Sequence, residues 1–87
     1  MNNLDYALAF KAMGDETRLK IIGMLKNGPL CACKILDALQ CTQPTLSYHM
    51  KMLCDSDLVT SKKDGKWMYY TLNRSLLKQL AEFVCSL

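Results

Sequence analysis

The sequence lacks the long apolar runs and leader segments that mark membrane and exported proteins. No stretch of about 18 consecutive apolar residues occurs in the chain, so neither a membrane span nor a membrane partner is expected. The N-terminal stretch MNNLDYALAF has no basic segment followed by an apolar one, and we therefore expect no signal peptide. A cytoplasmic location is predicted, where thiols stay reduced. The five cysteines are then expected to be free thiols rather than a disulfide framework, as their odd number also indicates.

Signatures of catalysis and of histidine-based metal binding are also missing. The chain has no nucleophile elbow, no phosphate-binding loop and no pair of carboxylates at a useful spacing. His49 is the only histidine, which excludes a zinc site built from several histidine and carboxylate ligands of one chain. We therefore expect neither enzymatic activity nor a prosthetic group. His49 is expected to have a structural role or to contact a phosphate.

Helical periodicity dominates the first two thirds of the chain. The first helix is expected to end at Gly14, and Asp15 can cap the second by accepting a backbone N–H bond. Thr42 is the predicted cap of the fourth helix, with Pro44 inside its first turn. The residues expected to face the core from the second, third and fourth helices are Leu19, Ile22 and Leu25; Ile35, Leu36 and Leu39; and Leu46, Met50 and Leu53.

Two β-rich runs, LVTSKK and KWMYYTL, follow the fourth helix. The pair Asp64 and Gly65 between them supplies the positive φ angles of a two-residue hairpin turn. The predicted order is α-α-α-α-β-β-α, a mainly α chain with one β-hairpin, which is typical of a winged helix-turn-helix. We expect a single DNA-binding domain over residues 1–87, with the helix-turn-helix at about 31–57 and the wing at about 58–72.

The terminal helices, predicted at about 3–13 and 74–86, lie outside this unit and keep apolar faces. The last one has Leu77, Leu80, Val84 and Leu87 at a 3-4-3 spacing, a narrow seam suited to pairing with another helix. A chain of 87 residues buries a thin core, and oligomers are a common remedy. We therefore predict a homodimer that forms through the terminal helices.

Polar side chains gather on one side of the predicted fourth helix and at the hairpin. A recognition helix presents such side chains to base edges in the major groove, and lysines at a hairpin tip suit a groove lined with phosphates. An ordinary solvated helix face and lysines that block edge-strand aggregation are the alternative explanations. Three aromatic side chains of the second β-rich run are expected to pack rather than to stack on bases: Trp67, Tyr69 and Tyr70. The predicted contacts to double-stranded DNA are Gln43, Thr45, Ser47, Tyr48, Lys51, Lys62, Lys63 and Lys66.

The Cys-x-Cys pair of LCACKIL stands where the third helix is expected to begin. Helix N-termini lower the pKa values of thiols, and thiolates bind soft, thiophilic ions. Successive helical residues are about 100° apart, so side chains two positions apart point to nearly opposite sides. Cys31 and Cys33 therefore bind one ion together only if the first turn distorts or is already irregular. A ligand that deforms this helix can change the orientation of the recognition helix. The alternative role of the two cysteines is simply to fill space in the core.

These stretches together resemble the ArsR/SmtB family of dimeric winged-helix repressors, specifically its arsenic-responsive branch. MGDETRLKII is similar to the family's Ala-Asp-x-Thr-Arg-x-x-Ile signature, PLCACKIL to its metalloid motif, TQPTLSYHMKMLCDSDLV to its recognition helix and KKDGKWMYYTL to its wing. The resemblance implies a transcriptional repressor that releases its operator when arsenite or antimonite, the inducer, binds Cys31 and Cys33. The polar residues of the predicted recognition helix fall at the family's DNA-contact positions.

The chain also departs from the family pattern. Some relatives carry a third cysteine five residues after the first, where this chain has Leu36, so the third inducer ligand stays open among Cys41, Cys54, Cys85, a partner chain and solvent. Tyr48 replaces the more usual His or Arg. The ligands of the family's zinc sensors and the N-terminal cysteines of its cadmium and lead sensors are missing, which favours arsenic.

Two other functions stay open on the sequence. Oxidation or persulfidation of the paired thiols would make a redox-sensing repressor of the same fold. Alternatively, the chain is a thiol-based metal-binding module with no role on DNA.

Overall fold

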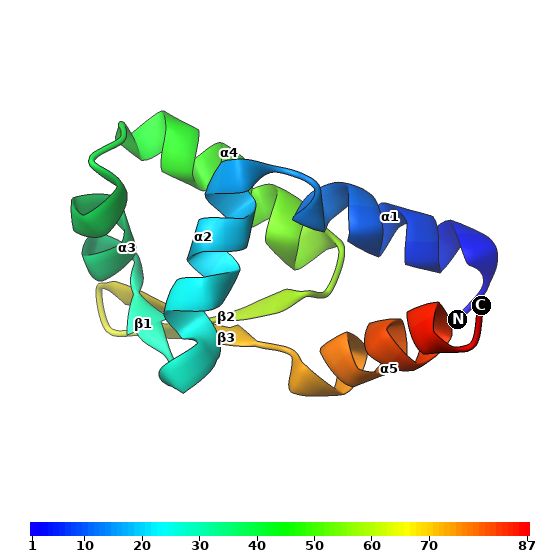
Figure 1. Ribbon diagram of the computed structural model, residues 1–87. Helices are drawn as coiled ribbons and strands as arrows, with labels where there is room; N and C mark the ends of the chain where they lie inside the picture. Colours follow the sequence, from blue (N-terminus) through cyan, green and yellow to red (C-terminus); the bar gives the residue numbers. More distant parts are fainter.

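The chain folds into five α-helices and a three-stranded antiparallel sheet, and the computed structural model describes all residues from 1 to 87 (Figure 1). The helices are α1 (Asn3–Met13), α2 (Glu16–Met24), α3 (Ala32–Leu39), α4 (Gln43–Asp55) and α5 (Arg74–Cys85), and a 3-10 turn, η1 (Leu25–Asn27), follows α2. The strands are β1 (Leu30–Cys31), β2 (Val59–Asp64) and β3 (Trp67–Leu72). The predicted order of helices and hairpin is confirmed, and β1 and η1 are additions.

The capping residues that the sequence indicates begin α2 and α4. The Asp15 carboxylate accepts the backbone N–H of Arg18 at 3.1 Å, and the Thr42 hydroxyl accepts the backbone N–H of Thr45 at 3.4 Å. Pro44 lies in the first turn of α4, where its missing N–H costs nothing. Local signals therefore fix where the two helices start.

The core lies between α2, α3, α4 and the sheet, and two of the three residues predicted to face it from the second helix do so: Leu25 is buried and Ile22 packs against the core. Ile21 and Leu25 are fully buried, whereas Leu19 keeps 51% of its surface exposed. The buried side of α2 also includes Arg18, whose N–H groups find acceptors inside the protein. The prediction is therefore wrong for Leu19 alone, because a buried arginine does not register in a pattern of apolar residues. The predicted faces of α3 and α4 are confirmed, with Ile35, Leu46, Met50 and Leu53 buried and Leu36 and Leu39 packed against them.

The hairpin of β2 and β3 forms as predicted, with its turn one residue later. Asp64 still pairs with Trp67, so the two turn residues are Gly65 and Lys66. Gly65 has a φ of 62°, the positive value that tight hairpin turns require at this position.

β1 attaches the segment before α3 to the central strand of the sheet, whose order is β1-β3-β2. Its two residues pair in antiparallel register, Leu30 with Tyr70 and Cys31 with Tyr69. Two residues are too few to show an alternating pattern, so the sequence contained no sign of this strand.

The terminal helices α1 and α5 run side by side at one end of the elongated molecule, where both termini also lie (Figure 1). The rings of Tyr6 and Phe83 stack between them, with centroids 3.9 Å apart. Leu80 of the predicted seam is buried, while Val84 and Leu87 remain 52% and 90% exposed. None of the five helices combines the length and the apolar character that a membrane-spanning helix requires.

Candidate functional site

α4 presents all of its predicted DNA contacts on the surface. Its apolar residues face the core, so the polar side of the helix faces outward. Lys51 forms an ion pair with Asp55 at 2.9 Å, but both side chains are exposed, and such a pair contributes less than about 1 kcal/mol. It therefore competes weakly with a phosphate for Lys51. The exposed residues of this face are Gln43, Thr45, Ser47, Tyr48 and Lys51.

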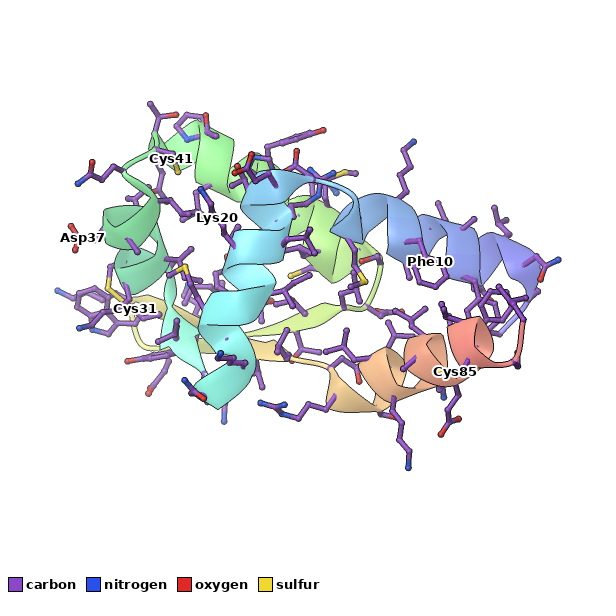
Figure 2. The ribbon with its side chains drawn as sticks, viewed as in Figure 1. Phe10, Lys20, Cys31, Asp37, Cys41 and Cys85 are labelled. Carbon is purple, nitrogen blue, oxygen red and sulfur yellow. A yellow bond between two sulfur atoms is a disulfide. The ribbon has the colours of Figure 1, made fainter.

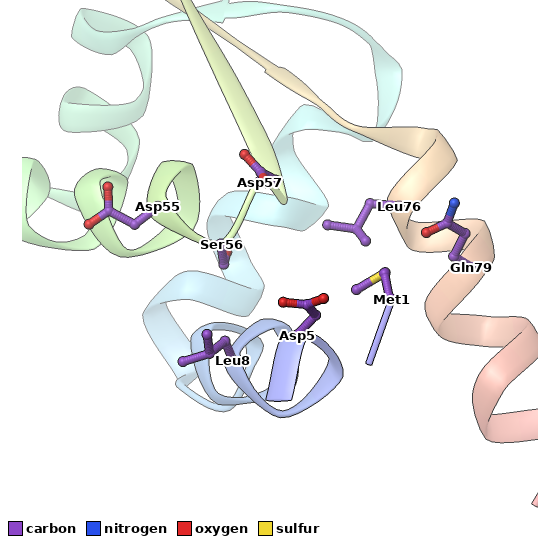
Figure 3. Close-up of a pocket in the computed structure, with 8 residues that line it drawn as sticks. All are labelled: Met1, Asp5, Leu8, Asp55, Ser56, Asp57, Leu76 and Gln79. Atoms are coloured by element: carbon purple, nitrogen blue, oxygen red, sulfur yellow. The ribbon is translucent and has the colours of Figure 1, made fainter. Parts of the chain in front are cut away.

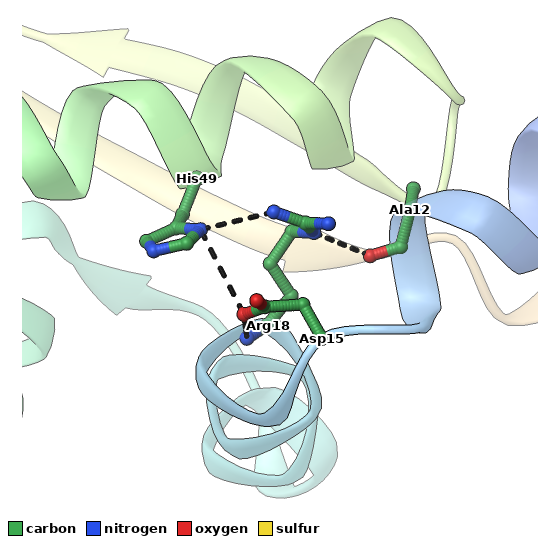
Figure 4. A network of polar contacts seen from close by, with 4 residues as sticks. All are labelled: Ala12, Asp15, Arg18 and His49. Carbon is green, nitrogen blue, oxygen red and sulfur yellow. Dashed lines mark hydrogen bonds and ion pairs between the residues drawn. The ribbon is translucent and has the colours of Figure 1, made fainter.

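A polar network beneath this face ties α4 to the junction between α1 and α2 (Figure 4). The Arg18 Nε–H donates to the carbonyl oxygen of Ala12 at 2.6 Å, and Arg18 Nη1 lies 3.1 Å from Nδ1 of His49 on α4. Arg18 is only 7% exposed, so these bonds form away from water, where they are strong. His49 thus has the structural role that was one of its two predicted roles.

Nδ1 of His49 has a second polar neighbour in the same network. It lies 3.9 Å from Oδ2 of Asp15, an ion pair that requires a proton on Nδ1. Arg18 has no acceptor, so its contact with Nδ1 at 3.1 Å requires Nδ1 to accept. The two contacts therefore use different protonation states of the ring, and the contact with Arg18 is the shorter one.

Asp15 is the acidic member of this cluster and caps α2. The backbone N–H of Arg18 lowers the pKa of the Asp15 carboxyl, with smaller contributions of the same sign from the charges of Arg18 and His49 and an opposing one from burial. The carboxylate is therefore ionised at neutral pH and faces the positive end of the α2 dipole.

The hairpin carries its predicted lysines on the surface and one large side chain that was expected to be packed. Lys62 and Lys63 lie on β2 and Lys66 lies in the turn, and all three are exposed. Trp67 is 47% exposed, so the prediction that it packs within the sheet is wrong. The Lys66 Nζ atom lies 5.3 Å from the centre of the Trp67 ring, within the range of a cation–π contact.

Cys31 and Cys33 are joined by a disulfide, so the prediction of five free thiols is wrong for this pair. The two sulfurs meet because Cys31 is not helical: it is the last residue of β1 and the N-cap of α3, with extended φ and ψ of −77° and 153°. Their Cα atoms are 5.4 Å apart. The sequence indicates that the two sulfurs act together only if the first turn distorts or is already irregular. The second condition holds, because Cys31 is extended while α3 is regular from Ala32.

The other three cysteines are free and do not complete a larger cluster around this pair. Cys85 lies on α5 at the opposite end of the molecule from Cys31 (Figure 2). Burial, and secondarily the charge of Asp55, raises the pKa of the Cys54 thiol, which disfavours the thiolate that a soft ion binds. Cys41 is half-buried at the turn between α3 and α4. No group of three histidine, cysteine or carboxylate side chains is placed to hold a metal ion.

One hollow of the surface lies away from both the cysteine pair and the hairpin. It has a volume of about 350 Å³ and lies between the start of α1, the end of α4 and the start of α5 (Figure 3). Two of its three carboxylates have other partners nearby, since Asp5 accepts the backbone N–H of Asn2 and Asp55 pairs with Lys51. The hollow was not predicted from the sequence and contains none of the predicted site residues.

Comparison with known proteins places these features in one family. Residues 15–61, more than half of the chain, match the family model described as bacterial regulatory protein, arsR family. The chain is 42% identical over 82 residues to an arsenical resistance operon repressor of Staphylococcus aureus, covering 94% of this chain and 79% of that protein. It is 43% identical over 77 residues to the protein of the same name from Staphylococcus xylosus, covering 88% and 74%. A crystal structure of an ArsR family transcriptional regulator superposes with a TM-score of 0.90 at 19% identity, over 99% of this chain and 89% of that one, and supports the fold.

Proposed function

Because the chain belongs to the arsR family of bacterial regulatory proteins, we propose that it is a DNA-binding transcriptional repressor whose inducer is trivalent arsenic or antimony. The observation that carries the inducer assignment is the meeting of the Cys31 and Cys33 side chains at the start of α3. In the reduced protein these are two thiols that can reach one atom. The exposed polar face of α4 and the lysines of the hairpin support the DNA assignment.

On DNA, α4 lies in the major groove with its N-terminal residues toward the bases. Gln43 pairs with adenine through its amide, and Ser47 and Thr45 donate to or accept from base edges. Tyr48 and Lys51 reach the phosphate backbone, and the lysines of the hairpin neutralise phosphates beside it. Affinity therefore falls steeply with salt concentration, because each neutralised phosphate releases counterions.

The active form is a homodimer held by the terminal helices. An apolar groove of about 370 Å³ runs between α1 and α5, and all seven of its lining residues are hydrophobic. It contains Phe10 and Met13 from α1 and Leu77, Ala81 and Val84 from α5. A second copy that covers this groove buries the exposed part of the predicted seam and places the two α4 helices on one duplex.

Binding of the inducer exchanges oxygen for sulfur without a change of oxidation state. Arsenite, As(OH)₃, reacts with the two thiols to give a dithiolate that keeps one As–OH bond, and two molecules of water leave with the two thiol protons. Because no third thiol lies beside the pair, the third ligand is the retained hydroxide, or a small thiol from solution that displaces it as water. The disulfide must first be reduced by two equivalents of a small thiol, which leave as their own disulfide, since thiols and not disulfides displace hydroxide from arsenic.

Release of DNA follows from what the two cysteines are attached to. Cys33 belongs to α3, which packs on the core beside α4, and Cys31 is paired through β1 with Tyr69 of the wing strand β3. An atom bound between the two sulfurs thus acts on the helix-turn-helix and on the wing together. Neither element needs to unfold for their relative placement on DNA to change.

The test is a mobility-shift assay on short duplexes tiled across the region upstream of the gene, with fully reduced protein. We expect retention of one duplex and its release by arsenite or antimonite. Cys31→Ser and Cys33→Ser should retain the duplex and fail to release it, while Cys85→Ser, a matched change at an exposed free thiol, should behave as the unchanged protein. If arsenite releases the duplex from both Cys31→Ser and Cys33→Ser, these two cysteines are not the inducer site.

The disulfide between Cys31 and Cys33 specifically favours a second candidate, a redox-sensing repressor of the same fold. Forming it removes two protons and two electrons from the thiols, and a peroxide takes them up to become two molecules of water. In the same assay, release by peroxide or polysulfide with arsenite inert would select this alternative. Release by arsenite, with peroxide inert, selects the metalloid.

A further inference from the structure

The hairpin tip exposes a large aromatic side chain in the middle of a basic cluster. Trp67 is 47% exposed although it belongs to a regular strand. Lys62, Lys63 and Lys66 lie on the same hairpin, Lys66 contacts the ring, and Asp64, the cross-strand partner of Trp67, is the one acidic residue there. The tip therefore combines a net positive charge with an uncovered indole.

The register of the sheet shows that Trp67 points away from the core. Residues paired across an antiparallel ladder share a face, and faces alternate along each strand. Val59 and Leu72 are a buried pair and define the inner face. Along β3, Trp67 lies an odd number of positions before Leu72, so its side chain points to the face opposite the inner one. The exposed Thr71 lies on the same outer face. Packing within the folded chain therefore does not explain why a tryptophan stands at this position.

The proposed dimer does not cover Trp67 either. The apolar groove between α1 and α5 lies at the end of the molecule that holds both termini, and the hairpin tip extends toward the other end beside α3 (Figure 1). A partner that binds the hairpin tip must be anionic to match the lysines and must offer a flat or apolar surface to the indole. A duplex has both, because its phosphates alternate with deoxyribose faces along the groove wall.

We propose that Trp67 is a DNA-contacting residue that packs on the deoxyribose wall of the minor groove, with Lys66 on the adjacent phosphate. This inference rests on the proposed function as a DNA-binding protein. The cation–π contact between Lys66 and Trp67 holds the ammonium group and the ring side by side, so both reach the same strand of the duplex. Trp67 contributes apolar contact, and Lys66 contributes charge.

Trp67 is the only tryptophan of the chain, so its fluorescence reports on this contact alone. With the duplex retained in the mobility-shift assay as probe, we expect the emission of Trp67 to shift to shorter wavelength on binding. Acrylamide should then quench it less than in the free protein. Arsenite, where it releases the duplex, should reverse both changes.

Substitutions separate the apolar contact from charge. Trp67→Ala should weaken DNA binding by about tenfold while leaving the slope of affinity against salt unchanged, because no phosphate contact is lost. Lys66→Ala should reduce that slope by about one. Trp67→Phe should restore most of the affinity. Leu19→Ala, at a similarly exposed apolar side chain on α2, is the matched control and should bind as the unchanged protein.

The outcomes distinguish this inference from the function on which it rests. If no duplex is bound even at low salt, both proposals are overturned. If duplex is bound but Trp67 emission and quenching do not change and Trp67→Ala binds with full affinity, only the role of Trp67 is overturned. If Trp67→Ala does not fold, the emission of the unchanged protein and the affinity of Trp67→Phe still decide.

Discussion

The network around Arg18 predicts a specific energetic coupling between α2 and α4. Replacing Arg18 by Met keeps most of the aliphatic stem and removes the guanidinium that bonds the Ala12 carbonyl and His49 Nδ1. The complementary change, His49→Ala, removes the acceptor on α4. The double variant then reports how much of the cost belongs to the bond between the two side chains.

The expected magnitudes follow from burial and bond type. Hydrogen bonds made by a charged group contribute about 1.5–3 kcal/mol each, and Arg18 makes two of them while 7% exposed. Burying the guanidinium also costs free energy, and Met removes that cost. We therefore expect Arg18→Met to lower the free energy of unfolding by about 2–4 kcal/mol. His49→Ala should cost about 1–2 kcal/mol, and the double variant should fall short of the sum by about 1–2 kcal/mol.

Urea unfolding followed by circular dichroism, at one fixed protein concentration because a dimer is proposed, measures these values. Arg74→Met is the matched control, since Arg74 is the other arginine and its side chain is exposed where it bonds the Lys26 carbonyl. It should cost less than about 1 kcal/mol. If Arg18→Met costs no more than Arg74→Met, or the two single changes add within about 0.5 kcal/mol, the network does not anchor α4.

Three further predictions concern other parts of the chain. Asp15 has a lowered pKa in the folded state, so its carboxylate stabilises the fold above the unfolded pKa of about 3.9, and this stabilisation is lost as the pH falls through the folded pKa. Asp15→Asn, which still caps α2, should therefore reduce the loss of thermal stability below about pH 4. If the variant loses thermal stability in acid as much as the unchanged protein does, this prediction is wrong. Leu53→Ala, at a fully buried position of α4, should lower the free energy of unfolding by about 2–5 kcal/mol in the same urea assay, and a cost below about 1 kcal/mol would contradict the described core. Val84→Asp, which puts a charge in the groove between α1 and α5, should give a folded monomer in sedimentation, whereas a persistent dimer would place the interface elsewhere.

Most of the fold was predictable because its signals are local. Asp15 and Thr42 begin helices through their own hydrogen bonds, and Gly65 supplies the positive φ of the hairpin turn. The side of α4 that faces outward follows from the spacing of its apolar residues. What escaped prediction depends on contacts between distant residues: the burial of Arg18 needs acceptors from α1 and α4, and the pairing of β1 needs a strand that lies some forty residues later in the chain.

The same limit explains the two misplaced side chains of the candidate site. β-propensity predicts that Trp67 is packed, but it does not tell which strand face is covered, and that depends on the register with β2. The disulfide escaped prediction because free thiols were inferred from the expected cytoplasmic location and the odd number of cysteines, and because the third helix was expected to begin at Cys31. A shift of one residue in the start of the helix makes Cys31 extended and brings the two sulfurs together.

In the proposed repressor, the position of the cysteine pair lets one fold distinguish two signals. Cys31 is fixed to the wing strand by β1 and Cys33 to the first turn of α3, so the link between the sulfurs sets the spacing between wing and helix-turn-helix. A disulfide joins the sulfurs by one bond, whereas an arsenic atom between them inserts a second bond and holds them further apart. Under this proposal the two ligation states place the hairpin differently relative to α4, and only one of them needs to match the spacing between major and minor groove on the duplex. Because α3 keeps its regular helix from Ala32 with the sulfurs already joined, the proposed release of DNA depends on this spacing and not on unfolding of α3.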